Sequence, residues 1–459
     1  MPAINTYMAI LTNRGVKKFI QLMHQGHGNT LSGELARMID PRILKKLSST
    51  MNVIAVTGTN GKTTTCNLIS NIFKSGHIPS VHNSLGNNLM SGITTAFIDD
   101  AGLNGKMKDK WAIVEVDEAT MVPFLKEITP KIIVINNFFR DQLDRYGEID
   151  LLIEKIYKAI EKVDAKLVLN ADDPFVNRFS DLKNEKIYFG IGADAIHFEK
   201  NSMADSKYCP NCGRPLHYSQ TFYGQLGYYS CECGFKRHDP KFEVENVRKA
   251  EHGYQLTINQ SDYILGLSGV HNIYNALAAF SVAQEIRIPI EAVREGLETY
   301  SVRNGRMTTY LFNHTRQVLN LVKNPAGYNI TISEVNDDPQ KKQIVLFLND
   351  FAADGEDISW IWDVDFEKFR NEKVWQIICS GTRAYDLAIR LKYAEIGEEK
   401  VRIIPNLKKA IDQALESASL TYYLPNYTPL EHVRSYLELR TQSDQSLSVP
   451  EKRMVRNQT

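Results

Sequence analysis

The sequence lacks several features that would place the protein in a membrane, in a secretory route or on nucleic acid. No apolar run approaches the roughly 20 residues that a membrane-spanning helix needs, and the N-terminus lacks the layout of a signal peptide. Charge of one sign is not in excess, because 54 Lys and Arg balance 54 Asp and Glu, whereas nucleic-acid binders usually carry a basic surplus. We therefore expect a cytoplasmic protein without a nucleic-acid partner.

Cysteine is scarce and unevenly distributed. Four of the six cysteines lie between positions 209 and 233, and in the cytoplasm such a cluster indicates metal ligands before disulfides. The other two, Cys66 and Cys379, have no neighbouring His and no nucleophile-elbow pattern. We interpret both as buried small residues. The chain therefore offers no obvious thiol nucleophile.

The 459 residues are about three times the length of a typical domain, so we expect two or three domains. Residues 1–48 have helix-like spacing and form an N-terminal helical segment. From 49 to 307, short apolar runs alternate with amphipathic stretches, which is typical of βαβ units and a mostly parallel sheet. A Cys-, Tyr- and Gly-rich insertion interrupts this series at about 200–240. A second alternating series at 308–440 predicts a C-terminal Rossmann-like α/β domain, and the polar tail 441–459 is expected to be disordered.

The strongest chemical signal is the stretch VIAVTGTNGKTTT. An apolar strand runs into a glycine-containing turn and a helical stretch, which places backbone N–H groups and a helix N-terminus around a phosphate. Lys62 would lie against the terminal phosphates of ATP, and the Thr63 hydroxyl would hold Mg²⁺. The strict pattern has Gly where this chain has Val56, and a chance glycine-rich turn is the alternative. The predicted nucleotide-binding residues of this loop are Gly58, Thr59, Asn60, Gly61, Lys62, Thr63 and Thr64.

A second magnesium ligand is predicted at the end of another strand. The stretch WAIVEVDEA has a buried-strand pattern that ends in Glu115, Asp117 and Glu118. A carboxylate at the C-terminal end of such a strand can reach the metal of the phosphate site. We predict Glu115 as the ligand. The alternative is that these acids cap the following helix.

The clustered cysteines predict a closed metal site. Cys209 and Cys212 lie on the turn CPNCG, and Cys231 and Cys233 lie on the turn CECGF, 18 residues further along. Four thiolates at this spacing form a tetrahedral Zn²⁺ site with no position for water, so the role is structural. The intervening residues are expected to form a β-hairpin, which completes a zinc ribbon. Reduced, metal-free cysteines are the alternative.

Four motifs, in order along the chain, carry a resemblance to a known family. They are TGTNGKTTT at 57–65, NADDP at 170–174, GVHNIYNALAA at 269–279 and GR at 305–306. Together they resemble the central-domain signatures of the Mur ligases, which use ATP to activate a carboxylate as an acyl phosphate. The resemblance implies an α/β fold with a Mur ligase-like central P-loop ATPase domain. It places Arg306 at the transferred phosphoryl group, and Asn272 and Asn275 at the nucleotide unless they merely cap their helix.

The chain also departs from the Mur ligase pattern. The domain that binds a UDP-linked sugar carrier is expected to be missing, because only about fifty residues precede the phosphate loop. Residues 141–144 read DQLD where the family has a metal-binding His, and 320–325 read NLVKNP where its C-terminal domain opens differently. Lys155 and Lys158 are equal candidates for the family's carbamylated lysine. The family's site for an incoming amino acid is therefore not transferred to this chain.

The zinc ribbon, the short N-terminus and the stretch NDFAADGEDISWIWD at 349–363 together resemble one subgroup of that family, the ligase-like subunits of lipid II isoglutaminyl synthase. The resemblance implies that ATP activates the α-carboxylate of D-glutamate in the lipid II stem peptide. Ammonia then displaces phosphate and leaves D-isoglutamine. The implied cofactors are ATP, Mg²⁺ and structural Zn²⁺, and the reaction would take place at the inner face of the membrane.

The ammonia must come from another polypeptide. Enzymes of this kind release it from glutamine with an activated Cys–His pair, and the resemblance implies a complex with the glutaminase GatD. An acidic residue of the 349–363 segment would complete the partner's pair. Asp357 is the predicted residue, with Asp350 and Asp354 in reserve, and Trp360 and Trp362 alternate in strand fashion as an interface hot spot. A turn with capping acids and core tryptophans is the alternative.

Two other functions stay open at this point. One is a ligase that adds an amino acid to a carboxylate, as in folylpolyglutamate synthase or a complete Mur enzyme. The other is a non-catalytic zinc-ribbon module that binds nucleic acid, against which the intact ATP loop counts. A steeply salt-dependent affinity for DNA or RNA would favour the second of these.

Overall fold

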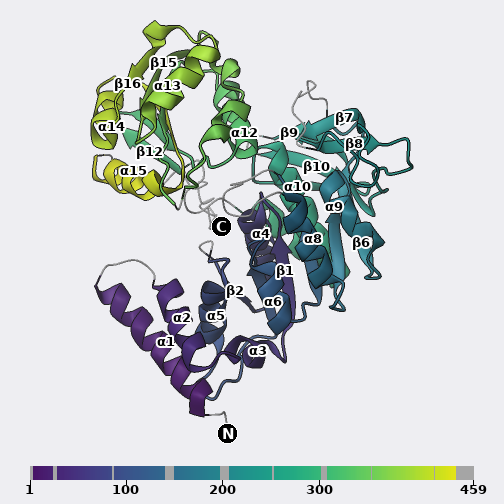
Figure 1. Ribbon diagram of the computed structural model, residues 1–459. Helices are drawn as coiled ribbons and strands as arrows, with labels where there is room; N and C mark the ends of the chain where they lie inside the picture. The colour runs from purple at the N-terminus through teal and green to yellow at the C-terminus, as the bar shows by residue number, and fades with distance from the viewer. Residues whose placement is uncertain are drawn as a thin grey trace, which may run out of the picture. The chain divides into compact units, whose positions relative to one another are not determined.

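The computed structural model describes residues 4–23, 28–84, 87–139, 149–196, 206–250, 253–300, 308–352, 354–417 and 419–440. The described residues up to 300 form one compact unit and those from 308 onward form another (Figure 1). Arg306, the DQLD stretch at 141–144 and the tail 441–459 lie outside the described residues. Within the described ranges, no helix has the length and apolar character of a membrane span.

The first unit is built on a nine-stranded sheet in the order β11-β10-β9-β6-β5-β4-β1-β3-β2. Its strands are β1 (Asn52–Thr57), β2 (Ser80–His82), β3 (Trp111–Glu115), β4 (Ile132–Ile135), β5 (Lys166–Asn170), β6 (Lys186–Ile191), β9 (Phe242–Lys249), β10 (Tyr254–Ile258) and β11 (Ser261–Leu265). The neighbours from β2 to β9 pair in parallel, and β10 and β11 add an antiparallel edge. The predicted mostly parallel sheet is therefore confirmed.

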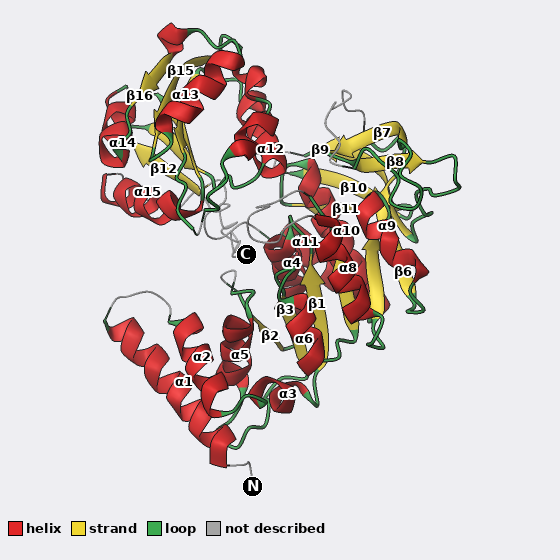
Figure 2. Cartoon of the chain, in the orientation of Figure 1, coloured by secondary structure: helices red, strands yellow, loops and turns green. Residues whose placement is uncertain are grey.

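The helices of this unit connect and cover the strands (Figure 2). They are α4 (Lys62–Ser75), α5 (Met90–Asp100), α6 (Met121–Glu127), α8 (Ile149–Ile160), α9 (Pro174–Asn177), η1 (Arg178–Asp181), α10 (Val270–Glu285) and α11 (Ile290–Glu298). Helix α4 starts directly after β1 and packs against both α10 and α11. This packing brings residues near 270 next to the loop near 60.

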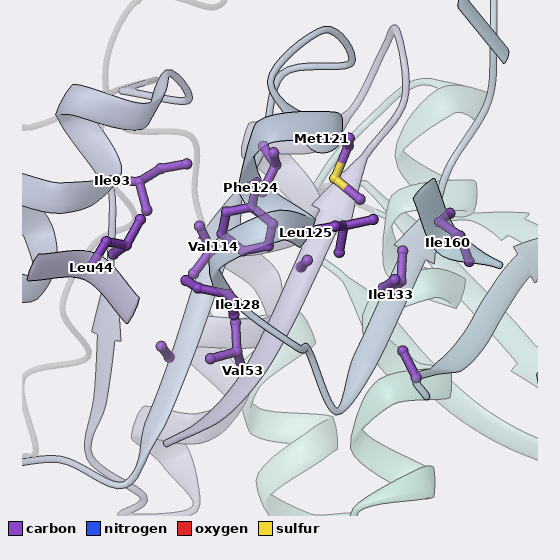
Figure 3. Packing of buried hydrophobic residues seen from close by; sticks show 14 of the residues in the cluster. Leu44, Val53, Ile93, Val114, Met121, Phe124, Leu125, Ile128, Ile133 and Ile160 are labelled. Carbon is purple, nitrogen blue, oxygen red and sulfur yellow. The ribbon is translucent and has the colours of Figure 1, made fainter. Parts of the chain in front are cut away.

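The first residues fold as three helices, α1 (Ile4–Leu22), α2 (Asn29–Ile39) and α3 (Ile43–Ser48). They pack on α5, and their buried side chains belong to the same hydrophobic core as β1, β3 and α6. Figure 3 shows this continuity, with Leu44 of α3 beside Ile93 of α5 and Val53 of β1 beside Ile128, which follows α6. The helical segment is thus part of the first unit and not a body of its own.

The cysteine-rich insertion forms a separate two-stranded antiparallel sheet of β7 (His217–Tyr223) and β8 (Leu226–Ser230). The turn between the strands contains Gly224 in a left-handed conformation with φ of 55°. This confirms the hairpin that was predicted between the two pairs of cysteines.

The second unit contains a six-stranded sheet in the order β12-β13-β17-β14-β15-β16. Its strands are β12 (Thr308–Phe312), β13 (Thr315–Leu319), β14 (Lys342–Phe347), β15 (Val374–Ser380), β16 (Val401–Ile403) and β17 (Leu420–Pro425). Only the pair β12–β13 is antiparallel. The helical elements are α12 (Pro325–Asp337), η2 (Ser359–Asp363), η3 (Phe366–Phe369), α13 (Ala384–Tyr393), η4 (Glu398–Lys400), α14 (Leu407–Glu416) and α15 (Tyr427–Arg440). This confirms the predicted C-terminal α/β fold.

Candidate active site

The loop between β1 and α4 has the geometry of a phosphate-binding loop. Gly58 and Gly61 both have positive φ, of 124° and 85°, which residues with a side chain rarely adopt. A Cβ on Gly58 would lie 2.7 Å from the carbonyl oxygen of Asn137. Asn137 also holds the loop, because its carbonyl accepts from Thr59 N at 2.8 Å and its Oδ1 accepts from Asn60 N at 2.9 Å. The loop is therefore held from the end of β4.

Lys62, the first residue of α4, is buried within this loop with only 7% of its surface exposed. Its Nζ donates to the carbonyl of Gly58 at 2.6 Å and lies 3.0 Å from Glu118 Oε2. Burial opposes the charge of the ammonium group, but the carboxylates of Glu118, Glu115 and Asp117 outweigh it and raise the pKa of Lys62. Lys62 is thus a fixed positive charge at the N-terminus of α4.

The predicted magnesium ligand lies one strand away from the loop. Glu115 ends β3, is buried, and is paired in register with Val56 of β1. Its Oε1 accepts from Asn88 Nδ2 at 3.1 Å, so it is not a helix cap. Asp117 does form a local turn, since its Oδ1 accepts from Ala119 N at 3.1 Å. Glu118 was one of the three acids that the sequence offered as a metal ligand or a helix cap, and its ion pair with Lys62 was not predicted.

A chain of polar side chains connects the loop to α10. Asn136 donates to Thr65 Oγ1 at 2.9 Å, Thr65 donates to Asn275 Oδ1 at 3.2 Å, and Asn275 donates to Asn272 Oδ1 at 3.0 Å. The N-cap of α10 is Gly269. Asn272 Nδ2 donates to the carbonyl of Ser268 at 2.6 Å, a local bond at the start of the helix, whereas the Asn275 side chain bonds Asn272 and Thr65. Asn136 Oδ1 is buried and has no hydrogen-bond partner among the described residues. Asn136 and Thr65 were not predicted.

Replacing Gly61 by alanine is expected to weaken ATP binding at least about tenfold, because a left-handed conformation strains a residue with a side chain by about 1–2 kcal/mol. The added Cβ would also lie 2.0 Å from Asn275 Oδ1. Titration with a fluorescent ATP analogue measures the Kd. Gly15→Ala in α1 is the matched control, because no atom lies within 4 Å of its Cβ. Unchanged affinity in Gly61→Ala would contradict the assignment of this loop.

The four predicted metal ligands lie together in the insertion. The Sγ atoms of Cys209, Cys212, Cys231 and Cys233 are all within 4.8 Å of one another. Two of the sulfur pairs are 3.6 Å and 3.5 Å apart, close to the roughly 3.8 Å edge of a tetrahedron with Zn–S bonds of about 2.3 Å. This donor set fits a closed tetrahedral metal site.

The tip of the metal-site hairpin contacts the phosphate-binding loop. Tyr223 OH accepts from Asn60 Nδ2 at 3.2 Å, and the Tyr223 ring lies 5.0 Å from the ring of Phe139. Gln225 Nε2 donates to the carbonyl of Phe138 at 2.6 Å. Because 163 residues separate Asn60 from Tyr223, no local pattern in the sequence could have identified this contact.

The NADDP motif joins the parts of this unit. Asp172 is fully buried and accepts from Arg237 Nε at 2.7 Å and from Tyr274 OH at 2.7 Å. Arg237 lies at the end of the insertion and Tyr274 lies on α10, so the Asp172 carboxylate connects the end of β5 to both segments. Asp173 caps α9 by accepting from Phe175 N at 2.9 Å, and burial raises the pKa of Asp173 to about 7. Both acids therefore have architectural roles.

The acidic segment of the second unit differs in part from its prediction. Asp354 is buried and accepts from Thr428 N at 2.7 Å, so its carboxylate is bound within this unit. Asp350 accepts from Thr382 Oγ1 at 2.8 Å. Asp357 is exposed and accepts from Ser359 N at 2.7 Å. Of the three acids, Asp357 is the exposed one.

The strand predicted for Trp360 and Trp362 is wrong, because both lie in the 3₁₀ helix η2. The Asp357 carboxylate accepts from Ser359 N and starts this turn. Trp360 packs toward Tyr328, whereas Trp362 is 47% exposed and stacks edge-on with Tyr393 at 5.2 Å.

The remaining residues singled out in the sequence are two isolated cysteines, two lysines and the NLVKNP stretch. Cys66 and Cys379 are fully buried, which confirms the positions predicted for them, and burial raises the pKa of both thiols. Lys155 and Lys158 are exposed on α8, and Lys158 pairs with Glu154 at 2.5 Å. In the NLVKNP stretch, Asn324 caps α12.

Known families match both units of the chain. A model of the Mur ligase middle domain matches residues 56–212, and a model of the MurT ligase C-terminal domain matches residues 321–430. The solved structure of a pseudomurein peptide ligase type C from Methanothermus fervidus has a TM-score of 0.66 at 26% identity, covering 85% of this chain and 79% of that one. The fold is therefore that of the Mur ligases.

Curated relatives match almost the full chain. Lipid II isoglutaminyl synthase (glutamine-hydrolyzing) subunit MurT from Staphylococcus aureus strain COL is 41% identical over 420 residues, which are 91% of this chain and 95% of the relative. The MurT subunit from Streptococcus pneumoniae strain ATCC BAA-255/R6 is 32% identical over 447 residues, 95% of this chain and 98% of the relative. The similarity thus includes the phosphate-binding loop, the insertion and the second unit.

Proposed function

Since the chain belongs to the MurT family, whose named members are ligase subunits of lipid II isoglutaminyl synthase, we propose that it amidates lipid II with ATP. The acceptor group is the α-carboxylate of D-glutamate in the stem peptide, and the product is D-isoglutamine. The observation that carries the proposal is the buried, positively charged Lys62 in a phosphate-binding loop. The reaction takes place at the inner face of the membrane, where the lipid-linked substrate lies.

The proposed chemistry has two steps. A carboxylate oxygen of the substrate attacks the γ-phosphorus of ATP, the bond to the β-phosphate oxygen breaks, and ADP leaves. Ammonia then attacks the acyl carbon of the resulting acyl phosphate, and inorganic phosphate leaves with the electron pair of the C–O bond. The nitrogen loses one proton, which the leaving phosphate can accept, and the amide remains. Lys62 and Arg306 neutralise charge on the transferred group. Thr63 and Glu115 would hold Mg²⁺, which shields the phosphate oxygens.

The nucleotide site in this proposal consists of the residues 58–64 together with Asn272 and Asn275 of α10. The contact chain through Thr65 supports the inclusion of α10, because it joins Asn275 to the loop. The unpaired, buried Oδ1 of Asn136 lies in the same chain. Asn136 is therefore a further candidate for a nucleotide or metal-water contact.

Ammonia is supplied by a partner subunit, which we propose to be the glutaminase GatD. The region 308–440 contacts it, and the exposed Asp357 completes its Cys–His pair. A row of exposed apolar side chains near this acid supports an interface. Tyr385, Ile389 and Tyr393 follow one another at helical spacing on α13, and Trp362 stacks on Tyr393. Exposed aromatic clusters of this kind are typical of binding hot spots.

Zn²⁺ is the metal we propose for the four cysteines, and its effect extends to the nucleotide. A tetrahedral Cys₄ site stabilises the fold around it, here the hairpin whose tip residue Tyr223 contacts Asn60. The hairpin also packs back onto β5, where Gly227 N donates to the carbonyl of Asp172 at 2.9 Å. Such docking within the ATPase unit favours an internal role over nucleic-acid binding.

Replacing Tyr223 by phenylalanine is expected to raise the KM for ATP about two- to tenfold, with little change in kcat, because it removes one hydrogen bond to the loop. Removal of the metal with a chelator should also raise the KM for ATP. Steady-state kinetics at varied ATP concentration measures both effects. Tyr218→Phe is the matched control, since Tyr218 OH bonds Ser206 O within the insertion at 2.8 Å. Equal effects of the two substitutions would contradict a specific role for Tyr223.

The proposed function is tested with purified chain, Mg-ATP, lipid II and ammonium chloride, with and without GatD and glutamine. Mass spectrometry reports whether the glutamate carboxyl group becomes an amide. Amidation with ammonium alone supports the ligase role, and dependence on GatD with glutamine identifies the source of ammonia. ATP consumption with free amino acids and no amide product would instead indicate an amino-acid ligase.

A further inference from the structure

Helix α1 carries an apolar stripe that faces away from the rest of the first unit. Its members are between 40% and 79% exposed, and they are Ile4, Tyr7, Met8, Leu11, Phe19 and Leu22. At about 100° of rotation per residue, all six fall within one sector about 120° wide. Gly15 and Lys18 lie in the same sector, and nothing lies within 4 Å of a Cβ on Gly15. Large exposed apolar patches mark interaction sites.

The opposite side of α1 anchors the helix firmly. Its buried residues are Thr6, Ala9, Ile10 and Asn13, and the helix packs against α2 and α5 (Figure 2). Asn13 Nδ2 donates to Thr95 Oγ1 at 3.0 Å, and Thr6 Oγ1 donates to Asp40 Oδ2 at 2.7 Å. These bonds fix the rotation of the helix, so the stripe is held outward.

The charged residues of helix α1 itself are all basic. The first 33 residues contain no Asp or Glu, although the whole chain has as many acids as bases, and they contain Arg14, Lys17 and Lys18. Lys17 pairs with Asp99 at 2.5 Å and Arg14 donates to carbonyl oxygens at the end of α5. Lys18 is exposed within the stripe itself. Glu34 on α2 is the first acidic residue of the chain.

We propose that the exposed face of α1 docks on an anionic lipid bilayer. Apolar side chains that lie in one sector of a helix, with a cation among them and no acid on the helix itself, are the features of helices that lie in the plane of a membrane interface. A long Lys side chain within the apolar face keeps its ammonium group at the headgroups. The proposal rests on the proposed function, in which the substrate is anchored in a membrane by its lipid. The exposed row Tyr385, Ile389 and Tyr393 on α13 belongs to the other unit, where we propose that the glutaminase binds.

Docking is tested by co-sedimentation of the chain with its partner subunit on vesicles. Binding to phosphatidylglycerol-rich vesicles is expected, with much weaker binding to phosphatidylcholine vesicles. Leu11→Glu with Phe19→Glu should reduce binding at least about tenfold, because two charges then oppose insertion. Leu103→Glu with Leu439→Glu is the matched control, since both leucines are exposed elsewhere. Equal binding by both double variants, or no binding by the wild-type complex, would overturn the proposal.

Amidation rates on two substrates distinguish a failure of membrane docking from a failure of the proposed function. The α1 variant should amidate a water-soluble stem-peptide analogue at the wild-type rate and lose rate on lipid II embedded in vesicles. If the wild type amidates neither substrate, the proposed function fails, while the vesicle-binding result still decides whether α1 docks. If light scattering shows a dimer that the α1 variant dissociates, a second copy covers the stripe and the membrane proposal is wrong.

Discussion

Lys62→Ala is expected to reduce kcat/KM for ATP-dependent amidation by about 10³-fold or more, with either glutamine or ammonium as the nitrogen source. Lys62 Nζ is held 3.0 Å from Glu118 and 2.6 Å from the Gly58 carbonyl, at the start of α4. No other side chain of the described loop provides a positive charge at this point. Its loss removes charge neutralisation at the transferred phosphoryl group. Initial rates measured by ADP release and by amide formation test the expectation.

The substitution also changes folding stability, which requires a control. Removing Lys62 breaks its ion pair with the buried Glu118 carboxylate, and breaking a buried ion pair costs about 3–5 kcal/mol. Lys62→Met combined with Glu118→Gln removes both charges at once and should melt close to the wild-type temperature. This double variant should still be inactive. Substantial amidation by the well-folded double variant would show that Lys62 has no role in phosphoryl transfer.

Asp357→Asn is expected to lower glutamine-driven amidation by roughly 10³- to 10⁴-fold, and to leave ammonium-driven amidation unchanged. Asparagine keeps an oxygen that can accept from Ser359 N, which Asp357 does at 2.7 Å, so the turn survives. In the proposed complex, the substitution removes only the negative charge that Asp357 would supply to the partner's His. Parallel assays of the complex with glutamine and with ammonium chloride measure the two amidation rates.

Asp363→Asn is the matched control, because Asp363 is an exposed acid at the end of η2 in the same segment. It should leave both rates unchanged. Loss of both rates in Asp357→Asn would mean that the residue serves the ligase site or the fold. Unchanged rates would exclude Asp357 and move attention to Asp350, which accepts from Thr382 at 2.8 Å.

Local sequence patterns were sufficient for most of the architecture. The strand, loop and helix around Gly58 are adjacent in the chain, and the periodicity of the flanking residues specifies each element. The antiparallel strands β9 to β11 were not predicted, because β9 and β10 include many partly exposed polar residues and lack a continuous apolar run. The cysteine spacing was enough to predict a four-sulfur cluster, which the structure brings together.

The error at the tryptophans has a simple physical cause. Residues two apart share a face in a strand but diverge by about 120° in a 3₁₀ helix. Trp360 is therefore turned toward the core while Trp362 is exposed. Two apolar residues at this spacing are compatible with a strand and with a 3₁₀ helix. The turn that Asp357 forms with Ser359 N starts the 3₁₀ helix here. That turn depends on a side-chain hydrogen bond, which periodicity does not reveal.

The parts of the site that the sequence could not supply are all contacts between distant segments. Glu118 is 56 residues from Lys62, and Asn275 is 210 residues from Thr65. Each residue type has several ordinary roles, so its partner is known only once the sheet order and the packing of α10 are known. Tyr223 is the clearest case, since it reaches the loop from an inserted hairpin.

Activation of the substrate carboxylate as an acyl phosphate transfers one of its oxygen atoms to the released phosphate, so an isotope measurement tests the proposed reaction. Lipid II with ¹⁸O in the α-carboxylate of its D-glutamate is incubated with the chain, Mg-ATP and ammonium chloride, and the released phosphate is analysed by mass spectrometry. We expect one ¹⁸O atom in the inorganic phosphate for each amide formed. Amide formation with unlabelled phosphate would exclude the acyl phosphate.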